Sequence, residues 1–381
     1  MIYITVRQSP MYHQMTLEEF LFQTEAVQTI LNDNTTNTRT YAVESVSDRF
    51  LSKFRFYIPG LIAKLEAFNA STEALRSRPR HDLYREFHIP KKSGGLRKID
   101  APEPELMDAL RRLKTIFEAD FRLLYHTSAF AYIRGRSTLD AVKRHQQNES
   151  KWFAKYDLSN FFGSTTLDFV IKMFSMIFPI SEIVKEERGQ AALSTALELA
   201  FLDGGLPQGT PISPLITNVM MIPVDYKLAN MLRDYNRQRY VYTRYADDFL
   251  VSSKYDFSFR DIENQIVSVL KSFDAPFTIK PEKTRYGSSA GSNWNLGVML
   301  NKDNQITIGH KKKRQFQAML TSYVLDSLHG SPWDKSDIQT LKGYMNYYMM
   351  VEGDVIVSIV DHIGVKYNVN IPKMIKADLK S

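Results

Sequence analysis

Residues 244–252 read RYADDFLVS, and this stretch decides the fold. Two adjacent aspartates, Asp247 and Asp248, lie between two apolar runs of β-forming residues. Such runs are normally buried, and a buried carboxylate is costly unless something binds it. An Asp-Asp pair also occurs in ordinary turns, because aspartate tolerates unusual backbone angles. We therefore expect a β-hairpin over 239–253 with Ala246, Asp247 and Asp248 at its tip, and the pair alone leaves a plain turn and a metal site both open.

A third aspartate, Asp157, ends another apolar segment, KWFAKYDLSNFF at 151–162, which we expect to form a strand. Three carboxylates gathered in one place repel one another, so they ionise together only around cations. Oxygen ligands without histidine or cysteine suit Mg²⁺. Two such ions, roughly 3.5–4 Å apart, are the usual arrangement for in-line phosphoryl transfer. The sequence thus predicts two Mg²⁺ ions, with Mn²⁺ as an alternative, beside Asp157, Asp247 and Asp248.

The composition fits a globular protein of 381 residues, 44% hydrophobic and 24% charged, long enough for two or three subdomains. Cysteine is absent, which excludes disulfides, zinc–thiolate sites and thiol nucleophiles. The net charge of +7 suits a polyanionic partner, although many proteins without such a partner are as basic. No signal peptide begins the chain, and the most apolar stretch is interrupted by Asp168, Lys172 and Pro179. We expect a soluble, cytoplasmic protein without a membrane partner.

The remaining segments predict a mixture of helices and short strands. A basic hairpin is expected around the Ser-Gly-Gly turn of HIPKKSGGLRKID. Apolar residues at helical spacing predict a helix over 102–121. The other expected elements are a mostly helical 1–80, helices at 191–202, 215–235 and 260–273, strands at 277–280 and 293–300, and a helical final 80 residues that include the basic cluster HKKKR at 310–314.

A series of segments in this order resembles the conserved blocks of reverse transcriptases, above all the bacterial enzymes of group II introns, retrons and phage defence. The segments are KKSGGLRKIDAPEPELMDALRRL, AYIRGRSTLDAV, KYDLSNFFGST, GLPQGTPISPLITN, YADD, FTIKPEKT, NLGVML and LKGYMNYY. The likeness covers about residues 85–350. It implies an α+β right-hand polymerase with an α-helical N-terminal extension (1–80), fingers (81–150), a palm (151–300, with a fingers insertion at about 165–205) and a helical thumb and C-terminal segment (301–381).

The resemblance also implies an RNA-directed DNA polymerase, a nucleotidyltransferase that extends DNA with deoxynucleotides. Asp157, Asp247 and Asp248 become its catalytic metal ligands, together with the backbone carbonyl of Leu158. Lys283 is placed near the leaving group as a counter-charge or proton donor. A surface lysine is the plainer reading of the same residue.

Several further residues are expected to contact the nucleotide or the nucleic acid. Phe162, five positions after Asp157, would exclude the ribose 2′-hydroxyl by its bulk. Side-chain alternation places one of Phe161 and Phe162 in the core and the other towards the site. Arg97 can grip a triphosphate bidentately. The full expected set is Lys91, Arg97, Phe162, Gln208 and Gly209 for the nucleotide, with Lys92 and Lys98 beside them, and Lys311, Lys312, Lys313 and Arg314 for the nucleic-acid backbone.

Other functions remain open at this stage. Phe162 argues against an RNA-templated RNA polymerase, which carries a second aspartate near that position. The intact acids, with Gln208 and Lys283, argue against a non-catalytic RNA-binding scaffold. Untemplated or protein-primed DNA synthesis stays open, because 20 tyrosines offer many hydroxyl groups.

Departures from the family pattern bear on the subtype. GTPISP is close to the intron-type form, and the Val-Thr-Gly and Asn-Ala-x-x-His signatures of retron enzymes are missing, apart from a faint echo in ITIGH. Too few residues follow the thumb segment for maturase and endonuclease domains. These features favour a defence-associated enzyme that copies a dedicated non-coding RNA template, with a partner protein or self-association left open.

Overall fold

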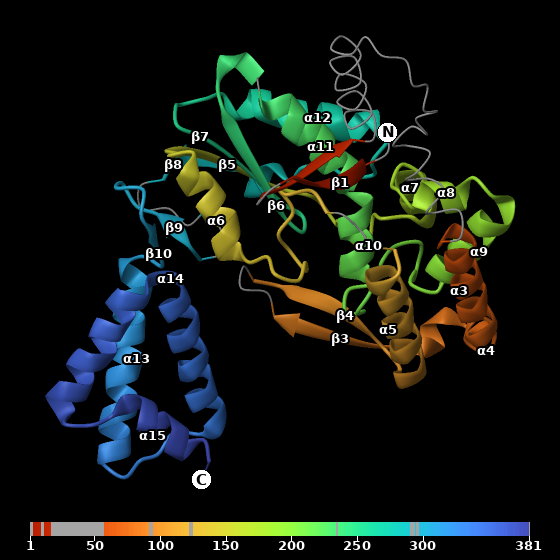
Figure 1. Ribbon diagram of the computed structural model, residues 1–381. Helices are drawn as coiled ribbons and strands as arrows, with labels where there is room; N and C mark the ends of the chain where they lie inside the picture. Colours follow the sequence, from red (N-terminus) through yellow and green to blue (C-terminus); the bar gives the residue numbers. More distant parts are fainter. Residues whose placement is uncertain are drawn as a thin grey trace, which may run out of the picture.

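The computed structural model describes residues 57–90, 94–121, 125–233, 235–289, 294 and 297–380, and the backbone of 3–8 and 11–16. At its centre lies an antiparallel four-stranded sheet in the order β6-β7-β5-β8 (Figure 1). Its strands are β5 (Trp152–Asp157), β6 (Tyr240–Tyr245), β7 (Asp248–Ser253) and β8 (Arg285–Ser288). The expected strand end at Asp157 and the expected hairpin are both confirmed.

Side-chain alternation along β5 assigns the two faces of this sheet. Ala154 and Tyr156 belong to the main hydrophobic core, whereas Phe153 packs into a smaller cluster on the other face. Because successive side chains of a strand point to opposite faces, Lys155 and Asp157 share the face of Phe153. The acidic strand end therefore lies on the side away from the main core.

Three helices cover the main-core face: α10 (Ser213–Met220), α11 (Ile222–Arg233) and α12 (Phe259–Ser272). A single helix was expected over 215–235, and the chain instead breaks at Met221. Pro223 is the second residue of α11, where a proline is tolerated because its missing N–H needs no helical partner. The short helix η2 (Tyr235–Arg237) follows.

A second, mostly helical region shares the main hydrophobic core with the sheet. Its hairpin of β3 (Tyr84–Pro90) and β4 (Leu96–Pro102) turns through Gly94 and Gly95, whose φ angles are +87° and +78°. The amphipathic helix α5 (Pro104–Ala119) buries its apolar stripe as predicted. The remaining elements are α3 (Tyr57–Ser71), α4 (Glu73–Arg76), η1 (Arg80–Leu83), α6 (Thr138–Gln147), α7 (Leu167–Phe174), α8 (Ile180–Val184) and α9 (Glu187–Glu198).

The C-terminal helices form a unit with its own hydrophobic core. They are α13 (His310–Leu328), α14 (Lys335–Tyr367) and α15 (Ile371–Asp378). Figure 1 shows them on the opposite side of the molecule from α3, α4 and α9. In the described part of the chain, no helix combines the length and apolar character needed to cross a bilayer.

Three expectations from the sequence were wrong in detail. Within the segment expected to be mostly helical, 1–80, β1 (Tyr3–Gln8) pairs with β2 (Met11–Thr16), in keeping with the β-branched run ITV, and residues 17–56 of that segment lie outside the described residues. Residues 277–280 form one isolated bridge, Leu158 with Ile279, because prolines at 276 and 281 flank the segment. Of the segment expected as a strand at 293–300, the structure describes residues 294 and 297–300, and among these the strand is β9 (Met299–Leu300), paired with β10 (Ile306–Thr307).

Candidate active site

Asp157 and Asp248 face each other across the two central strands. They are direct partners in the register of β5 and β7, and both side chains lie on the face of the sheet away from the main core. Like charges at directly opposed positions destabilise a sheet, so this pair requires compensation. The compensation comes from nearby lysines.

Two lysines contact Asp157. The Lys283 ammonium donates to both carboxylate oxygens at 3.0 Å, and Lys280 Nζ lies 3.2 Å from Oδ1. The backbone holds this segment in place, because the Lys280 N–H donates to the Asp157 carbonyl at 2.8 Å. Burial alone would lower the pKa of Lys283, but the hydrogen bonds and charge of Asp157 outweigh it and the pKa is raised. The structure places Lys283 at Asp157 on the short helix η3 (Pro281–Lys283), and its expected role near the leaving group stays a prediction.

Asp248 has its own lysine. Lys155 Nζ donates to Asp248 Oδ2 at 2.7 Å, and both side chains are about one-fifth exposed. Burial raises the pKa of Asp248, and Lys155 opposes this rise. Lys155 stands two residues before Asp157 on the same strand, so alternation places it on the face of the acids.

Asp247 completes the acidic group at the tip of the hairpin. Burial raises the pKa of its carboxyl, followed by the charges of Asp248 and Asp157, while Lys283 acts in the opposite direction. Its backbone carbonyl accepts the Leu158 N–H at 3.1 Å, which ties the tip to the end of β5. None of the described cations lies within ion-pair distance of its carboxylate.

The three acids offer oxygen ligands to a metal ion. Across the described residues, no three acidic or histidine side chains are grouped closely enough to enclose a metal ion by themselves. Their donor chemistry nevertheless fits a hard divalent cation, because all three are carboxylates. Burial is the main cause of the raised pKa values of Asp247 and Asp248, so a bound cation would stabilise the ionised form of both carboxyls.

A buried ion pair contacts the backbone at the turn of the β6–β7 hairpin. Arg244 and Asp225 have fully buried side chains and form two hydrogen bonds of 2.8 Å, and the Tyr242 hydroxyl donates to Asp225 at 2.8 Å. The remaining Arg244 nitrogen donates to Asn218 Oδ1 at 3.1 Å and to the Ala246 carbonyl at 3.2 Å. Ala246 has a φ of 56°, which is uncommon for a residue with a side chain. The network therefore fixes the backbone turn that presents Asp247.

The family follows from a comparison of the sequence. A family model described as "Reverse transcriptase (RNA-dependent DNA polymerase)" matches residues 89–317. This chain belongs to the reverse transcriptase family. It is an RNA-directed DNA polymerase with a right-hand fold, and enzymes of its family generally use divalent metal ions.

Curated relatives include several retron enzymes. The retron Ec83 reverse transcriptase of Escherichia coli is 26% identical over 308 residues, which cover 79% of this chain and 92% of the relative. The retron Ec73 enzyme of the same species is 26% identical, covering 69% of this chain and 81% of the relative. The retron Mx162 enzyme of Myxococcus xanthus is 27% identical, covering 71% and 58%. Among reverse transcriptases, this chain is thus similar to retron enzymes of bacteria, although the Val-Thr-Gly and Asn-Ala-x-x-His signatures of those enzymes are missing from its sequence.

Solved structures of telomerase are also similar to this reverse transcriptase. Apo telomerase from Candida tropicalis aligns with a TM-score of 0.45 and 10% identity, covering 95% of this chain and 67% of that one. A form of it truncated from the C-terminal domain has a TM-score of 0.40 and 13% identity, and the match spans 59% of this chain and about half (54%) of that one.

The palm loop with Gln208 and Gly209 packs against the base of the fingers hairpin. The Asp100 N–H donates to the Gln208 carbonyl at 2.8 Å. Gly209 has a φ of +121°, and a Cβ there would lie 2.9 Å from the Asp100 carbonyl oxygen and from Ile99. Glycine is therefore required by contact with β4, whereas the sequence suggested close approach to the nucleotide.

The basic residues of the fingers hairpin differ in their surroundings. Arg97 is exposed on β4. Lys98 pairs with Glu86 at 3.0 Å and Asp100 at 3.2 Å, so its charge is engaged within the hairpin. Lys91 and the neighbouring Lys92 lie outside the described residues. Of the predicted nucleotide-contacting cations on this hairpin, Arg97 is thus described, exposed and not engaged in an ion pair with a described carboxylate.

Phe161 and Phe162 differ in burial, although both pack in or against the main hydrophobic core. Phe161 is buried at 3% exposure, whereas Phe162 is half-buried and meets the Phe161 ring edge-on at 5.6 Å. The difference arises in a turn, because the strand ends at Asp157 and alternation does not continue. The Leu206 N–H donates to the Phe162 carbonyl at 2.9 Å and fixes its backbone. A role as sugar gate stays a prediction.

The four cations at the start of the thumb helix α13 are not equivalent. Lys313 forms an ion pair of 2.8 Å with Glu352, and both side chains are largely buried. Lys312 donates to the Gly297 carbonyl at 2.7 Å. Lys311 and Arg314 are exposed and remain suited to bind phosphates.

Sequence reasoning missed Tyr132, Lys155, Lys280 and the pair of Arg244 with Asp225. Tyr132 is 58% exposed, and its ring lies 6.4 Å from that of Tyr245. Burial, Tyr245 and Asp247 raise the pKa of its hydroxyl while Arg97 lowers it, so Tyr132 stands between palm acids and fingers. Its φ of 57° is an outlier for an aromatic residue, which is typical of functional positions.

Proposed function

We propose that this reverse transcriptase adds deoxynucleotides to a primer on an RNA template at Asp157, Asp247 and Asp248, with two Mg²⁺ ions. One observation carries this proposal. Asp157 and Asp248 are opposed in register beside Asp247, and the carboxylates are only partly compensated by lysines. Such a group suits cations that bridge a protein and a triphosphate.

The three carboxylates and the Leu158 carbonyl would hold the ions. Bound Mg²⁺ supplies positive charge beside the reacting phosphate and favours ionisation of the primer 3′-hydroxyl. Lys283, half exposed while it contacts Asp157, has the reach to move its ammonium towards the leaving pyrophosphate. Lys155 keeps Asp248 ionised and oriented.

The nucleotide would lie between the fingers hairpin and the palm. Arg97, with Lys91, would bind the triphosphate, and Gln208 and Gly209 would border the base pair. Phe162 would stand beside the sugar, where its ring excludes a 2′-hydroxyl. The exposed Lys311 and Arg314 of the thumb would hold the phosphates of the duplex.

The proposal also covers the biological role of the enzyme. A dedicated non-coding RNA is the template, the enzyme acts in the cytoplasm, and its DNA product serves antiviral defence. The similarity to enzymes named as retron reverse transcriptases supports the use of an RNA template. Fingers at 81–150, palm at 151–300 and thumb from 301 describe the working parts, in which α13 to α15 form the thumb.

Primer extension tests the function directly. Purified enzyme is given an RNA template with a DNA primer, matched deoxy- and ribonucleotides, and no metal, Mg²⁺ or Mn²⁺. We expect templated addition of deoxynucleotides that requires a divalent ion. Extension without a divalent ion, or equal use of both sugars, would contradict the proposal. Sequencing the nucleic acid that copurifies with the enzyme then identifies the template.

A further inference from the structure

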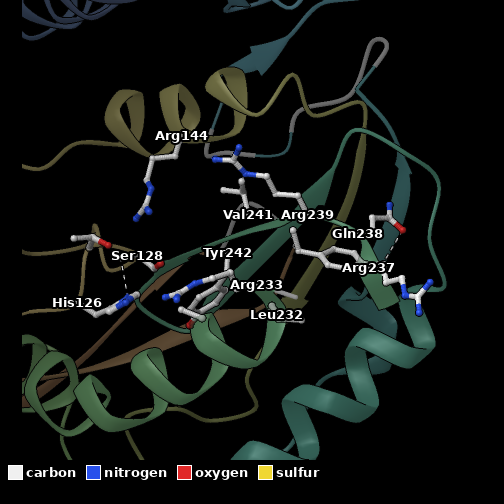
Figure 2. A pocket seen from close by; sticks show the side chains of 13 residues that line it. His126, Ser128, Arg144, Leu232, Arg233, Arg237, Gln238, Arg239, Val241 and Tyr242 are labelled. Atoms are coloured by element: carbon white, nitrogen blue, oxygen red, sulfur yellow. Dashed lines mark hydrogen bonds between the residues drawn. The ribbon is translucent and has the colours of Figure 1, made fainter. Parts of the chain in front are cut away.

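A cavity of about 790 Å³ lies along the outer edge of the palm sheet, away from the acids. It is bordered by α6, the end of α11, the first half of β6 and residues 126–128. Four of its lining residues are arginines, namely Arg144, Arg233, Arg237 and Arg239, and none of the described lining residues is acidic. Figure 2 shows Arg144 reaching from α6 towards the space above His126 and Ser128.

Arg144 is the central observation. Its side chain is half-buried, and its Nη1 atom is inaccessible to solvent and has no hydrogen-bond partner among the described residues. No described carboxylate lies within ion-pair distance of it. Burial lowers the pKa of this guanidinium, as does the charge of Arg136. A guanidinium that is partly removed from water without an anion is unfavourable, and a bound anion would relieve the cost.

The other arginines extend this positive charge across the rim of the cavity. Arg233, Arg237 and Arg239 are exposed, and the described residues provide no carboxylate partner for any of them. His126 adds no charge at neutral pH, because burial lowers its pKa to about 4. Several guanidinium groups along one opening suit a chain of phosphates better than a single small anion.

The aromatic rings at the cavity are already engaged. Tyr240 packs edge-on against Phe257 at 5.3 Å, and Tyr242 packs against Phe249 at 5.6 Å with its hydroxyl bound to Asp225. Neither ring is available to stack on a base. The chemistry of the cavity therefore favours phosphates over nucleobases, and contacts of this type do not depend on sequence.

The cavity is separate from the site of catalysis. On β6 the cavity is lined by residues 240–242 and Tyr245 adjoins the acids, so strand separations of three to five residues place the lining roughly 10–17 Å from Tyr245. A phosphate held by Arg144 or Arg239 therefore belongs to a part of the nucleic acid that is not being copied at that moment.

We propose that this arginine pocket binds the phosphate backbone of an RNA segment outside the polymerase cleft and anchors the template RNA to the palm. The inference rests on the proposed use of an RNA template. It adds a second, sequence-independent contact on the outer edge of the sheet.

Salt-dependent RNA binding tests the pocket. The protein variant Arg144→Gln/Arg239→Gln removes two pocket charges, and Lys373→Gln/Lys376→Gln removes two exposed charges from α15 as a matched control. The probes are a long fluorescein-labelled oligouridylate and a short RNA–DNA primer–template that the cleft holds by itself. The dissociation constant of each is measured from roughly 0.05 to 0.2 M KCl.

We expect the pocket variant to bind the long RNA at least tenfold more weakly and to lose about 0.7 of the log–log salt slope for each phosphate contact removed. Its affinity for the short primer–template should stay within twofold of the parent. A slope equal to that of the control, or an equal loss for both probes, would overturn the proposal. If the double variant fails to fold, the single variant Arg239→Gln, at an exposed position, is held to the same criteria.

Two further measurements separate the possible sources of phosphate. Titration with dATP and with inorganic pyrophosphate should give no binding that depends on the pocket arginines. Binding of dATP that is lost in the variant while RNA binding is unchanged would assign the pocket to a free nucleotide and overturn the RNA anchor. Primer extension reports separately on the proposed function, so the two ideas fail independently.

Discussion

Asp157 and Asp248 lie opposite each other on adjacent strands, and each is held by a different lysine. Lys283 binds both oxygens of Asp157, and Lys155 binds one oxygen of Asp248. The two acids are therefore balanced separately, and Asp247 remains as the carboxylate without a described cation partner. This inequality among the three acids leads to the first prediction.

Replacing Asp247 by Asn should abolish catalysis without harming the fold. The substitution keeps the shape and removes a charge whose pKa is raised by burial and by its acidic neighbours, so the free energy of unfolding should be unchanged or higher. Nucleotide addition should fall by several orders of magnitude, as measured by primer extension. Asp303→Asn, at an exposed turn, is the matched control. Retained activity in purified Asp247→Asn enzyme would refute the metal site.

Shrinking Phe162 should relax the choice of sugar. Phe162→Ala removes a half-buried ring, and ribonucleotides should then be used at least tenfold to a hundredfold better relative to deoxynucleotides. Single-nucleotide extension with matched substrates measures the ratio. Phe161→Leu, in the core, should leave the ratio unchanged. Loss of activity with both sugars in Phe162→Ala would assign the ring to packing alone.

The basic start of α13 should separate into binding and structural cations. Lys311→Gln/Arg314→Gln should flatten the salt dependence of duplex binding, because two exposed charges are lost. Lys313→Met should instead lower the free energy of unfolding by about 1–3 kcal/mol, since it leaves the largely buried Glu352 without its ammonium partner. Urea denaturation and binding at several salt concentrations distinguish the two. An unchanged salt slope in the first variant would make that pair an ordinary solvated surface.

Breaking the buried pair should destabilise the palm strongly. Asp225→Asn or Arg244→Met leaves one fully buried group without its charge partner, at a cost of about 3–5 kcal/mol. The double variant Asp225→Asn/Arg244→Met should be less unstable than the sum of the single variants. Strict additivity of the three unfolding free energies would show that the two side chains do not stabilise each other.

The stability of the enzyme should fall in mild acid because of His145. Its ring is fully buried between Ser252 and Thr243, at 2.6 and 2.8 Å, and burial lowers its pKa to about 3. Below pH 6.5 the unfolded chain takes up a proton that the folded chain refuses. The free energy of unfolding therefore drops by up to about 1.4 kcal/mol per pH unit for this one group.

The variant His145→Gln isolates that contribution. It should be less stable than the parent at pH 8, and the gap should narrow as the pH falls towards 5, as measured by urea denaturation at each pH. His329→Gln, at an exposed position, provides the comparison. A constant gap between parent and His145→Gln would contradict the assigned protonation.

The sequence predicted those features of the enzyme that depend on neighbouring residues, such as strand ends and turns. The turn at Ala246 and the strand end at Asp157 follow from alternation and from turn-forming residues. Lys155 was within reach of the same reasoning, because it stands two residues from Asp157. The helix break at Met221 was less accessible, since the apolar pattern continues across it.

Long-range partners could not be read in this way. Lys283 meets Asp157 across 126 positions of sequence, and Arg244 meets Asp225 on a different element. From sequence alone, a charged residue such as Arg244 is expected at the surface. Its burial depends on Asp225, a buried acid that only the folded structure brings beside it. Lys311 is exposed, whereas Lys313 is largely buried in an ion pair. This difference likewise depends on Glu352, which lies on α14 and contacts Lys313 alone of the two.

The bond from the Asp100 N–H to the Gln208 carbonyl gives the fingers hairpin a pivot. This bond holds the Asp100 end of β4 against the loop of Gln208. From Asp100, β4 extends outward to the turn at Gly94 and Gly95. Arg97 stands three residues out from the pivot, roughly 10 Å along β4. A small rotation there would swing its guanidinium by a few ångströms while the palm stays still. We therefore expect the part of β4 beyond this bond, Arg97 included, to be the part that moves when a nucleotide binds.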